Sequence, residues 1–202
     1  MPYSIRVLSR SDRIVPVAQL EKRLRRDGLA TAIEVVEGAP SSWRQLLLKH
    51  RQGAPIVRIQ RNPIEAGGPG AGELEGFRQE VGRYKPGSAA LWLQEYLGQV
   101  RCVYVIQVLG GTEEPGGWDA IHAVQWEIWT TLGGILQADG EGFSNEDGYH
   151  ILWQFPDDAA GPWNVAVLGA AGRWVAFEMD LGDPGHRRAF LGGQAPEGAR
   201  RL

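Results

Sequence analysis

Cysteine and long apolar runs are both scarce in this chain. Its 202 residues include one cysteine, Cys102, and no apolar run approaches the roughly 18 residues that a membrane-spanning helix needs. A single cysteine excludes an intramolecular disulfide and a zinc site made of four thiolates. The N-terminal segment MPYSIRVLSRSDR lacks the apolar stretch of a secretory signal peptide. These absences predict a cytoplasmic protein without membrane contact, whose cysteine is a small apolar core residue in a buried strand.

Neither sign of charge dominates the sequence. The formal net charge is −3, and the densest basic run is KRLRR at residues 22–26. That run lies on a predicted helix, where it is typical of a solvated face, so the sequence predicts no nucleic-acid partner. Glycine, at 28 residues, is about twice as frequent as usual, which indicates many turns in a folded chain.

The short motifs of several common enzyme classes are also missing. The sequence contains no G-x-x-x-x-G-K-[ST], H-E-x-x-H or G-x-S-x-G motif. The glycine-rich GGPGAG precedes a predicted helix without the lysine of a phosphate-binding loop, so it is interpreted as a connecting loop. These absences disfavour nucleotide-binding proteins, zinc metalloproteases and α/β-hydrolases, and no cofactor is predicted. An enzyme whose site is assembled from distant residues remains compatible with them.

Apolar periodicity predicts an α+β fold. Alternation with a period of two and β-branched residues indicate strands, whereas apolar spacing of three to four residues with capping residues indicates helices. The predicted strands cover residues 3–7, 31–37, 43–50, 54–61, 99–109, 135–139, 148–155, 163–168 and 173–180. The predicted helices cover residues 16–28, 73–82, 88–97, 118–132 and 183–191.

The order of these elements predicts antiparallel or mixed sheets flanked by helices. Each half of the chain follows the plan strand, helix, several antiparallel strands, helix, so we expect two similarly organised halves packed as one body. The predicted boundaries are residues 1–99 for the N-terminal half, 100–191 for the C-terminal half and 192–202 for a flexible tail.

An acidic segment, QADGEGFSNEDGYHILWQF at residues 137–155, carries the densest group of chemically capable side chains. If its predicted strands pair as a hairpin, Asp139 or Glu141 approaches His150, and a neighbouring carboxylate would orient the imidazole and raise its pKa. These three residues are therefore the candidate catalytic groups of an alternative, enzymatic hypothesis.

The same segment allows two further interpretations. Asp139, Glu141 and Asp147 are candidate oxygen ligands for a hard cation, although the spacing does not match an EF-hand loop. The structural interpretation is a turn in which Asn145, Asp147 and Gly148 bond local backbone and accept a positive φ.

The predicted helix at residues 118–132 has a broad, heavy face that we expect to lie mostly in the core. Gln125 stands near the centre of this face, with His122 and Trp126 on its shoulder. A buried amide must find hydrogen-bond partners, so Gln125 either bridges a strand edge or lines a pocket with His122. His122 and Gln125 are therefore candidate binding residues.

The predicted strand at residues 173–180 supplies a second candidate surface. Trp174, Glu178 and Asp180 share one face of this strand, which places an aromatic platform beside two carboxylates. That combination suits a polar ligand or a basic peptide, and it also suits an ordinary half-exposed sheet.

Taken with the absence of catalytic motifs, these surfaces predict a non-catalytic binding or interaction protein. Its predicted partner is a protein or a small polar ligand, with no metal and no cofactor, and nothing in the sequence specifies an oligomeric state. The alternative is a metal-assisted or acid–base hydrolase centred on the acidic loop at residues 139–150.

Overall fold

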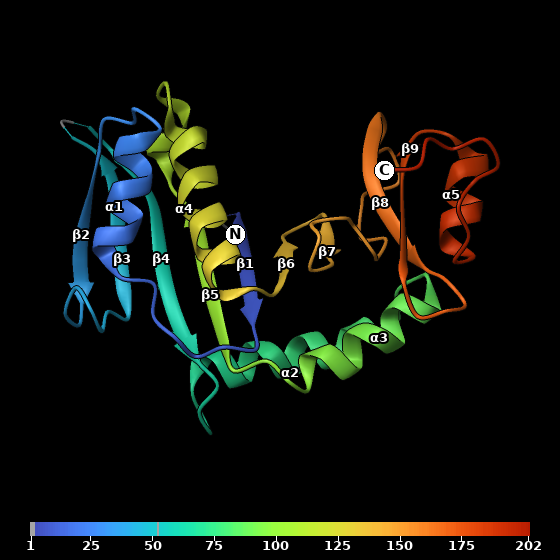
Figure 1. Ribbon diagram of the computed structural model, residues 1–202, viewed down its shortest axis with the longest axis horizontal. Coiled ribbons are helices and arrows are strands. Elements are labelled where there is room, and N and C mark those ends of the chain that lie inside the picture. Colours follow the sequence, from blue (N-terminus) through green and yellow to red (C-terminus); the bar gives the residue numbers. More distant parts are fainter. Residues whose placement is uncertain (1–2, 52) are drawn as a thin grey trace. The chain divides into compact units, whose positions relative to one another are not determined.

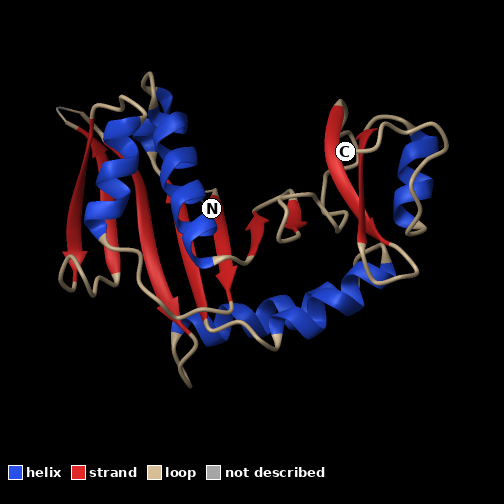
Figure 2. Cartoon of the chain, viewed as in Figure 1, coloured by secondary structure: helices blue, strands red, loops and turns tan. Residues whose placement is uncertain are grey.

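The computed structural model describes residues 3–51 and 53–202 and confirms the α+β prediction. These residues contain five α-helices, one short 3-10 helix and nine strands (Figures 1 and 2). The strand pairs described below are all antiparallel. Among the described residues, no helix has the length and apolar character that crossing a membrane requires.

The chain divides into two compact units, each built from two chain segments. Unit 1 contains the described residues up to Ala71 together with Val100–Gly134, and unit 2 contains Gly72–Gln99 together with Ile135–Leu202. This division differs from the predicted contiguous halves. The physical reason is that the strand Cys102–Val108 hydrogen-bonds between two strands of the N-terminal segment, so the chain returns to unit 1 after residue 99.

Unit 1 is a sheet with two helices packed against it. The strands are β1 (Ser4–Ser9), β2 (Thr31–Glu37), β3 (Gln45–His50), β4 (Pro55–Pro63) and β5 (Cys102–Val108). The helical elements are α1 (Val17–Arg26), the 3-10 helix η1 (Gly110–Glu113) and α4 (Gly117–Leu132). Within this unit the strands are ordered β2-β3-β4-β5-β1. Helices α1 and α4 contact each other, and they pack on β2 and on β1 and β4, respectively (Figure 1).

Strand register explains why one face of this sheet is the core. Ile5 is paired with Ile106, and Ile106 with Ile59, so large apolar side chains line up across three strands. All three are buried. On the opposite face, Arg58 donates a hydrogen bond to its cross-strand partner Gln107 at 3.0 Å.

The largest buried side chain of unit 1 comes from a loop. Trp43, in the loop that connects β2 to β3, is fully buried, and its indole Nε1 donates a hydrogen bond to the backbone oxygen of Val15 at 2.8 Å. Its ring meets Tyr104 edge to face, with the ring centroids 5.8 Å apart. Trp43 therefore ties the loop before α1 to the centre of the sheet.

Cys102 is predicted to be chemically inert in the folded protein. Its thiol is buried, as the sequence predicts, and burial raises its pKa to about 12. Because the thiolate is the reactive form, we expect no reaction with an aromatic disulfide reagent in native buffer and one equivalent of reaction in urea. Absorbance of the released thiol measures both. Complete labelling of the native protein at the rate of the unfolded one would contradict this assignment.

Unit 2 contains two hairpins and three helices. The strands are β6 (Ile135–Ala138), β7 (Gly142–Ser144), β8 (Pro162–Leu168) and β9 (Trp174–Asp180). The helices are α2 (Pro69–Val81), which begins at the end of unit 1, α3 (Gly87–Leu97) and α5 (Pro184–Leu191). Phe155, Phe177 and Phe190 are the largest side chains of an apolar cluster that joins the β8–β9 hairpin to α5.

Two segments of unit 2 differ from the sequence predictions. Residues 148–155 form no regular strand, because Ile151 and Leu152 are adjacent and both fully buried, which breaks the alternation of a strand. Residues 192–202 are expected as a flexible tail, but their last three residues pair with β9, where Arg201 bridges Phe177. Leu202 donates a backbone hydrogen bond to Ala176 at 3.1 Å, and the backbone oxygen of Arg200 accepts one from β9 at 3.0 Å. The segment satisfies backbone groups of β9 that do not pair with β8.

Candidate functional site

The acidic segment places its carboxylates and its imidazole at different positions along the strands. Ala138 is paired with Gly142, so Asp139 and Glu141 flank Gly140 in the turn between β6 and β7. His150 instead forms isolated bridges with Ser144, at the far end of β7, and with β8. The pairing that would bring Asp139 or Glu141 opposite His150 is therefore not the one observed.

His150 is held by neutral hydrogen-bonding partners. Its Nδ1 accepts a hydrogen bond from Trp163 Nε1 at 2.8 Å and lies 3.2 Å from the hydroxyl of Ser144. Because an indole nitrogen can only donate, Nδ1 must be unprotonated and the neutral ring carries its proton on Nε2. Burial lowers the pKa of His150 to about 4, the opposite direction from the shift expected beside a carboxylate.

Asn145 and Gly148 build the turn that precedes His150. The Asn145 side-chain oxygen accepts backbone hydrogen bonds from Asp147 at 3.1 Å and Tyr149 at 2.9 Å. Gly148 has φ of 85°, a left-handed conformation in which glycine has no steric penalty. Asp147 itself is exposed. Among the described residues, no group of three or more His, Cys, Asp or Glu side chains is arranged to hold a metal ion.

The three side chains of the predicted platform on β9 make contacts within unit 2. Trp174 packs edge to face on Trp92 of α3, with centroids 5.0 Å apart. Glu178 forms a 2.6 Å ion pair with Arg200. Asp180 Oδ1 accepts backbone hydrogen bonds from two glycines, Gly161 at 3.0 Å and Gly182 at 2.8 Å. Each of the three side chains thus has an intramolecular partner.

A shallow depression of unit 2 brings His150 and Glu178 to one surface. It has a volume of about 400 Å³ and is lined by Gly148, His150, Pro162, Trp163, Asn164 and Glu178. The imidazole of His150 is hydrogen-bonded to the indole of Trp163, and the carboxylate of Glu178 is paired with Arg200.

Helix α4 separates small or branched apolar side chains from large aromatic ones. Its buried residues are Gly117, Ala120, Ile121, Ala123, Val124 and Ile128. Trp118 is 44% exposed, although its helix face is expected to lie mostly in the core, and Trp126, on the shoulder of that face, is 49% exposed. The physical reason is that α4 packs flat against the sheet and α1, where small and branched side chains fit and an indole does not. Gln125 is half-buried rather than central to the core.

The exposed side of α4 forms one wall of a groove in unit 1. The groove has a volume of about 420 Å³ and is lined by Arg23, Asp27, Leu29, Asp119, His122, Ala123 and Trp126. His122, a predicted binding residue, is among them, and its ring lies 6.0 Å from that of Trp118. Gln125, the other predicted residue of this helix, is not in the lining. We name Trp118, His122 and Trp126 the α4 aromatic face.

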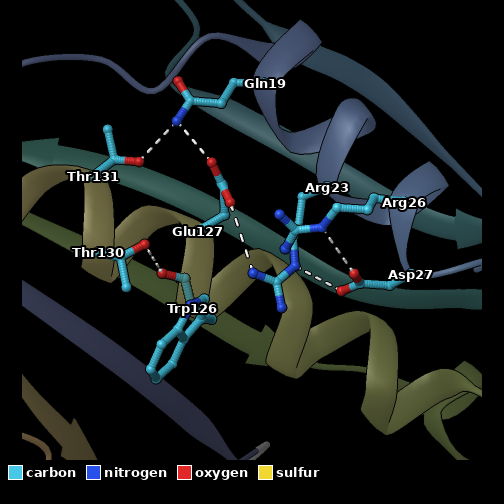
Figure 3. A network of polar contacts seen from close by, with 8 residues as sticks. All are labelled: Gln19, Arg23, Arg26, Asp27, Trp126, Glu127, Thr130 and Thr131. Carbon is cyan, nitrogen blue, oxygen red and sulfur yellow. Dashed lines mark hydrogen bonds and ion pairs between the residues drawn. The ribbon is translucent and has the colours of Figure 1, made fainter.

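A network of polar contacts joins α1 to α4, and two of its members, Arg23 and Asp27, line the groove (Figure 3). Gln19 Nε2 donates to Glu127 at 2.7 Å and to the hydroxyl of Thr131 at 2.8 Å. Arg23 bonds Asp27 at 2.6 Å and lies 4.0 Å from Glu127. The hydrogen bond from Arg23 lowers the pKa of Asp27 below its ordinary value. Figure 3 shows the indole of Trp126 pointing away from this network.

Asp119 differs from the other carboxylates of the groove. It lies exposed in the first turn of α4. Within residues 3–51 and 53–202, its carboxylate has no hydrogen-bond or ion-pair partner, whereas Asp27 and Glu127 are both paired. Asp119 and Trp126 are seven residues apart, which is about two helical turns, so they share one stripe of the helix.

The sequence contains a signal for this surface. Trp118, His122 and Trp126 follow each other at intervals of four residues, and the residues between them include enough small and branched apolar side chains to fill a core face. Such a pattern indicates a second, aromatic stripe beside the core stripe. Comparison with known protein families, curated proteins and solved structures found no match to this chain.

Proposed function

We propose that this protein is a non-catalytic binding protein of the cytoplasm that contacts a partner protein through the α4 aromatic face. The observation that carries this proposal is the pair of roughly half-exposed tryptophans, 44% at Trp118 and 49% at Trp126, beside a groove on one helix. Tryptophan is a frequent centre of protein interfaces because it gives a large contact area at little cost in side-chain entropy.

Three further observations support the proposed role, the proposed kind of partner and the proposed compartment, in that order. His150 is hydrogen-bonded to an indole and a hydroxyl, and the observed strand pairing does not bring Asp139 or Glu141 opposite it. The net charge of −3 argues against nucleic acid as the partner. The buried thiol of Cys102 is compatible with a reducing cytoplasm.

The proposal predicts that binding depends on the two indoles. Peptides selected from a random library on the wild-type protein should bind a W118A/W126A variant at least about tenfold more weakly, because each truncation removes a large contact surface. Fluorescence anisotropy of the selected peptides measures the affinities. The L91A variant is the matched control, since Leu91 is an exposed apolar residue of α3 with 65% exposure.

Selected peptides that bind the wild type, W118A/W126A and L91A equally well would contradict the proposed contact surface. A library that yields no binder of the wild type would contradict the proposed function itself. Circular dichroism of each variant checks that the loss is not one of folding.

A further inference from the structure

The groove beside the α4 aromatic face is open along the helix. Trp118 and Trp126 are separated by eight residues, which corresponds to about 12 Å along an α-helix. Ala123 lies between Asp119 and Trp126 along this stripe and lines the groove with a single methyl group. The short side chain leaves a notch between a carboxylate and an indole. Because the stripe extends beyond the length of one side chain, it can contact several residues of a polypeptide segment, one of which places its side chain in the notch.

Most charged side chains at the groove form ion pairs within unit 1. Arg23 is paired with Asp27 and with Glu127, and Arg26 lies 3.4 Å from Asp27. The cations at the α1 wall are therefore neutralised by acidic neighbours. Asp119 is the carboxylate of the groove lining that has no such partner among the described residues. The groove thus presents one carboxylate that no described side chain pairs with, in the first turn of α4 where the helix dipole favours a negative charge.

A carboxylate beside an exposed indole is complementary to a cation. The face of tryptophan attracts ammonium and guanidinium groups through its ring quadrupole, and arginine is found there more often than lysine. A guanidinium is planar, so it can stack on the indole while its N–H groups donate to the carboxylate. An anionic side chain would meet Asp119 without compensation.

Building on the proposed function, we infer that the partner presents an arginine side chain to the notch formed by Asp119, Ala123 and Trp126, with apolar neighbours over Trp118. The occupant is a cationic, partly apolar segment of another protein. Charge gives the site its preference for arginine, and the indoles give most of the contact area.

Two tripeptides that differ in one charge test this inference. Ac-Leu-Arg-Leu-NH₂ carries a guanidinium, and Ac-Leu-citrulline-Leu-NH₂ is its neutral, nearly isosteric analogue. Titration of ¹⁵N-labelled protein, followed at the tryptophan indole N–H signals, measures both affinities. We expect the citrulline peptide to bind about fivefold more weakly, since a cation–π contact and one charged hydrogen bond are lost.

Variants then assign the effect to residues. D119N should lower the affinity for the arginine peptide to that of the citrulline peptide, and D119E should restore part of it. W126A should weaken both peptides. E95Q, which removes an exposed carboxylate from α3, is the control for the change in net charge and should leave both affinities unchanged.

Four results would overturn the inference, and the first three come from the peptide titrations. They are equal affinity for arginine and citrulline, an unchanged arginine affinity in D119N, and no saturable shift with the arginine peptide. Self-association of the free protein that W126A abolishes would also overturn it, because a second copy would then be the occupant. None of these results decides the proposed function, because the peptide-library selection with W118A/W126A tests that function separately.

Discussion

Replacing Trp43 by alanine is expected to lower the free energy of unfolding by about 3–5 kcal/mol. The side chain is fully buried, packs edge to face on Tyr104 with 5.8 Å between centroids, and donates a hydrogen bond to Val15. Truncation removes these contacts, leaves a cavity and strands a buried backbone oxygen. Urea unfolding followed by far-ultraviolet circular dichroism measures the loss.

Two other variants show whether this loss reflects burial. W43F keeps most of the volume and the ring contact but removes the N–H, so about 1–3 kcal/mol is expected from the unpaired oxygen of Val15. W126A truncates the same residue type at a 49% exposed position, where the expected change is within about 1 kcal/mol. If W43A and W126A destabilised the protein equally, the assignment of Trp43 to the core and of Trp126 to a contact surface would be wrong.

The contrast between Trp43 and Trp126 also shows what sequence pattern can predict. Periodicity located α4 within one residue at its start and correctly at its end, because Gly133 stops a helix that carries a continuous apolar stripe. It did not distinguish which of two apolar stripes faces the sheet. That choice depends on how closely α4 approaches its neighbours, which is set by the small side chains of Ala120 and Ala123.

Long-range strand pairing explains the other differences. The sequence predicts the β8 and β9 hairpin from a glycine-containing turn, which is a local signal, and the structure confirms it. The position of β5 between β4 and β1 depends on pairing across many residues of chain, and no local pattern encodes it. The same is true of residues 192–202, whose composition is typical of a tail but whose last three residues pair with β9.

The candidate site shows the same division between local and long-range information. His122 is predicted to line a pocket with Gln125; His122 lines the groove, whereas Gln125 does not. Arg23 and Asp27 come from α1, almost a hundred residues earlier in the chain, so only the packing of α1 on α4 brings them to the same groove. The structure shows which of these charges pair: Arg23 binds Asp27, whereas Asp119 has no side-chain partner among the described residues.

The second large effect is expected at His150, as a dependence of stability on pH. The pKa of this imidazole is about 4 in the folded protein, against an ordinary value of 6.5. Between pH 4 and pH 6.5, His150 is protonated in the unfolded chain and neutral in the folded protein. The free energy of unfolding therefore falls as pH is lowered through 6.5 and levels off below about pH 4. At about 1.4 kcal/mol per pKa unit, the total loss is about 3.5 kcal/mol.

The hydrogen bond from Trp163 gives this effect a structural cause that can be tested separately. A proton on Nδ1 would place two donors face to face, at a site where Trp163 Nε1 now lies 2.8 Å from an acceptor. Denaturation midpoints measured from pH 4 to pH 7 should show a smaller slope in H150F, which does not titrate, and an unchanged slope in H122Q, which removes an exposed imidazole. Nitrogen chemical shifts of the ring should identify the Nε2–H tautomer at pH 7. A slope that is the same in H150F and wild type would show that His150 is not the group whose neutrality the folded state requires.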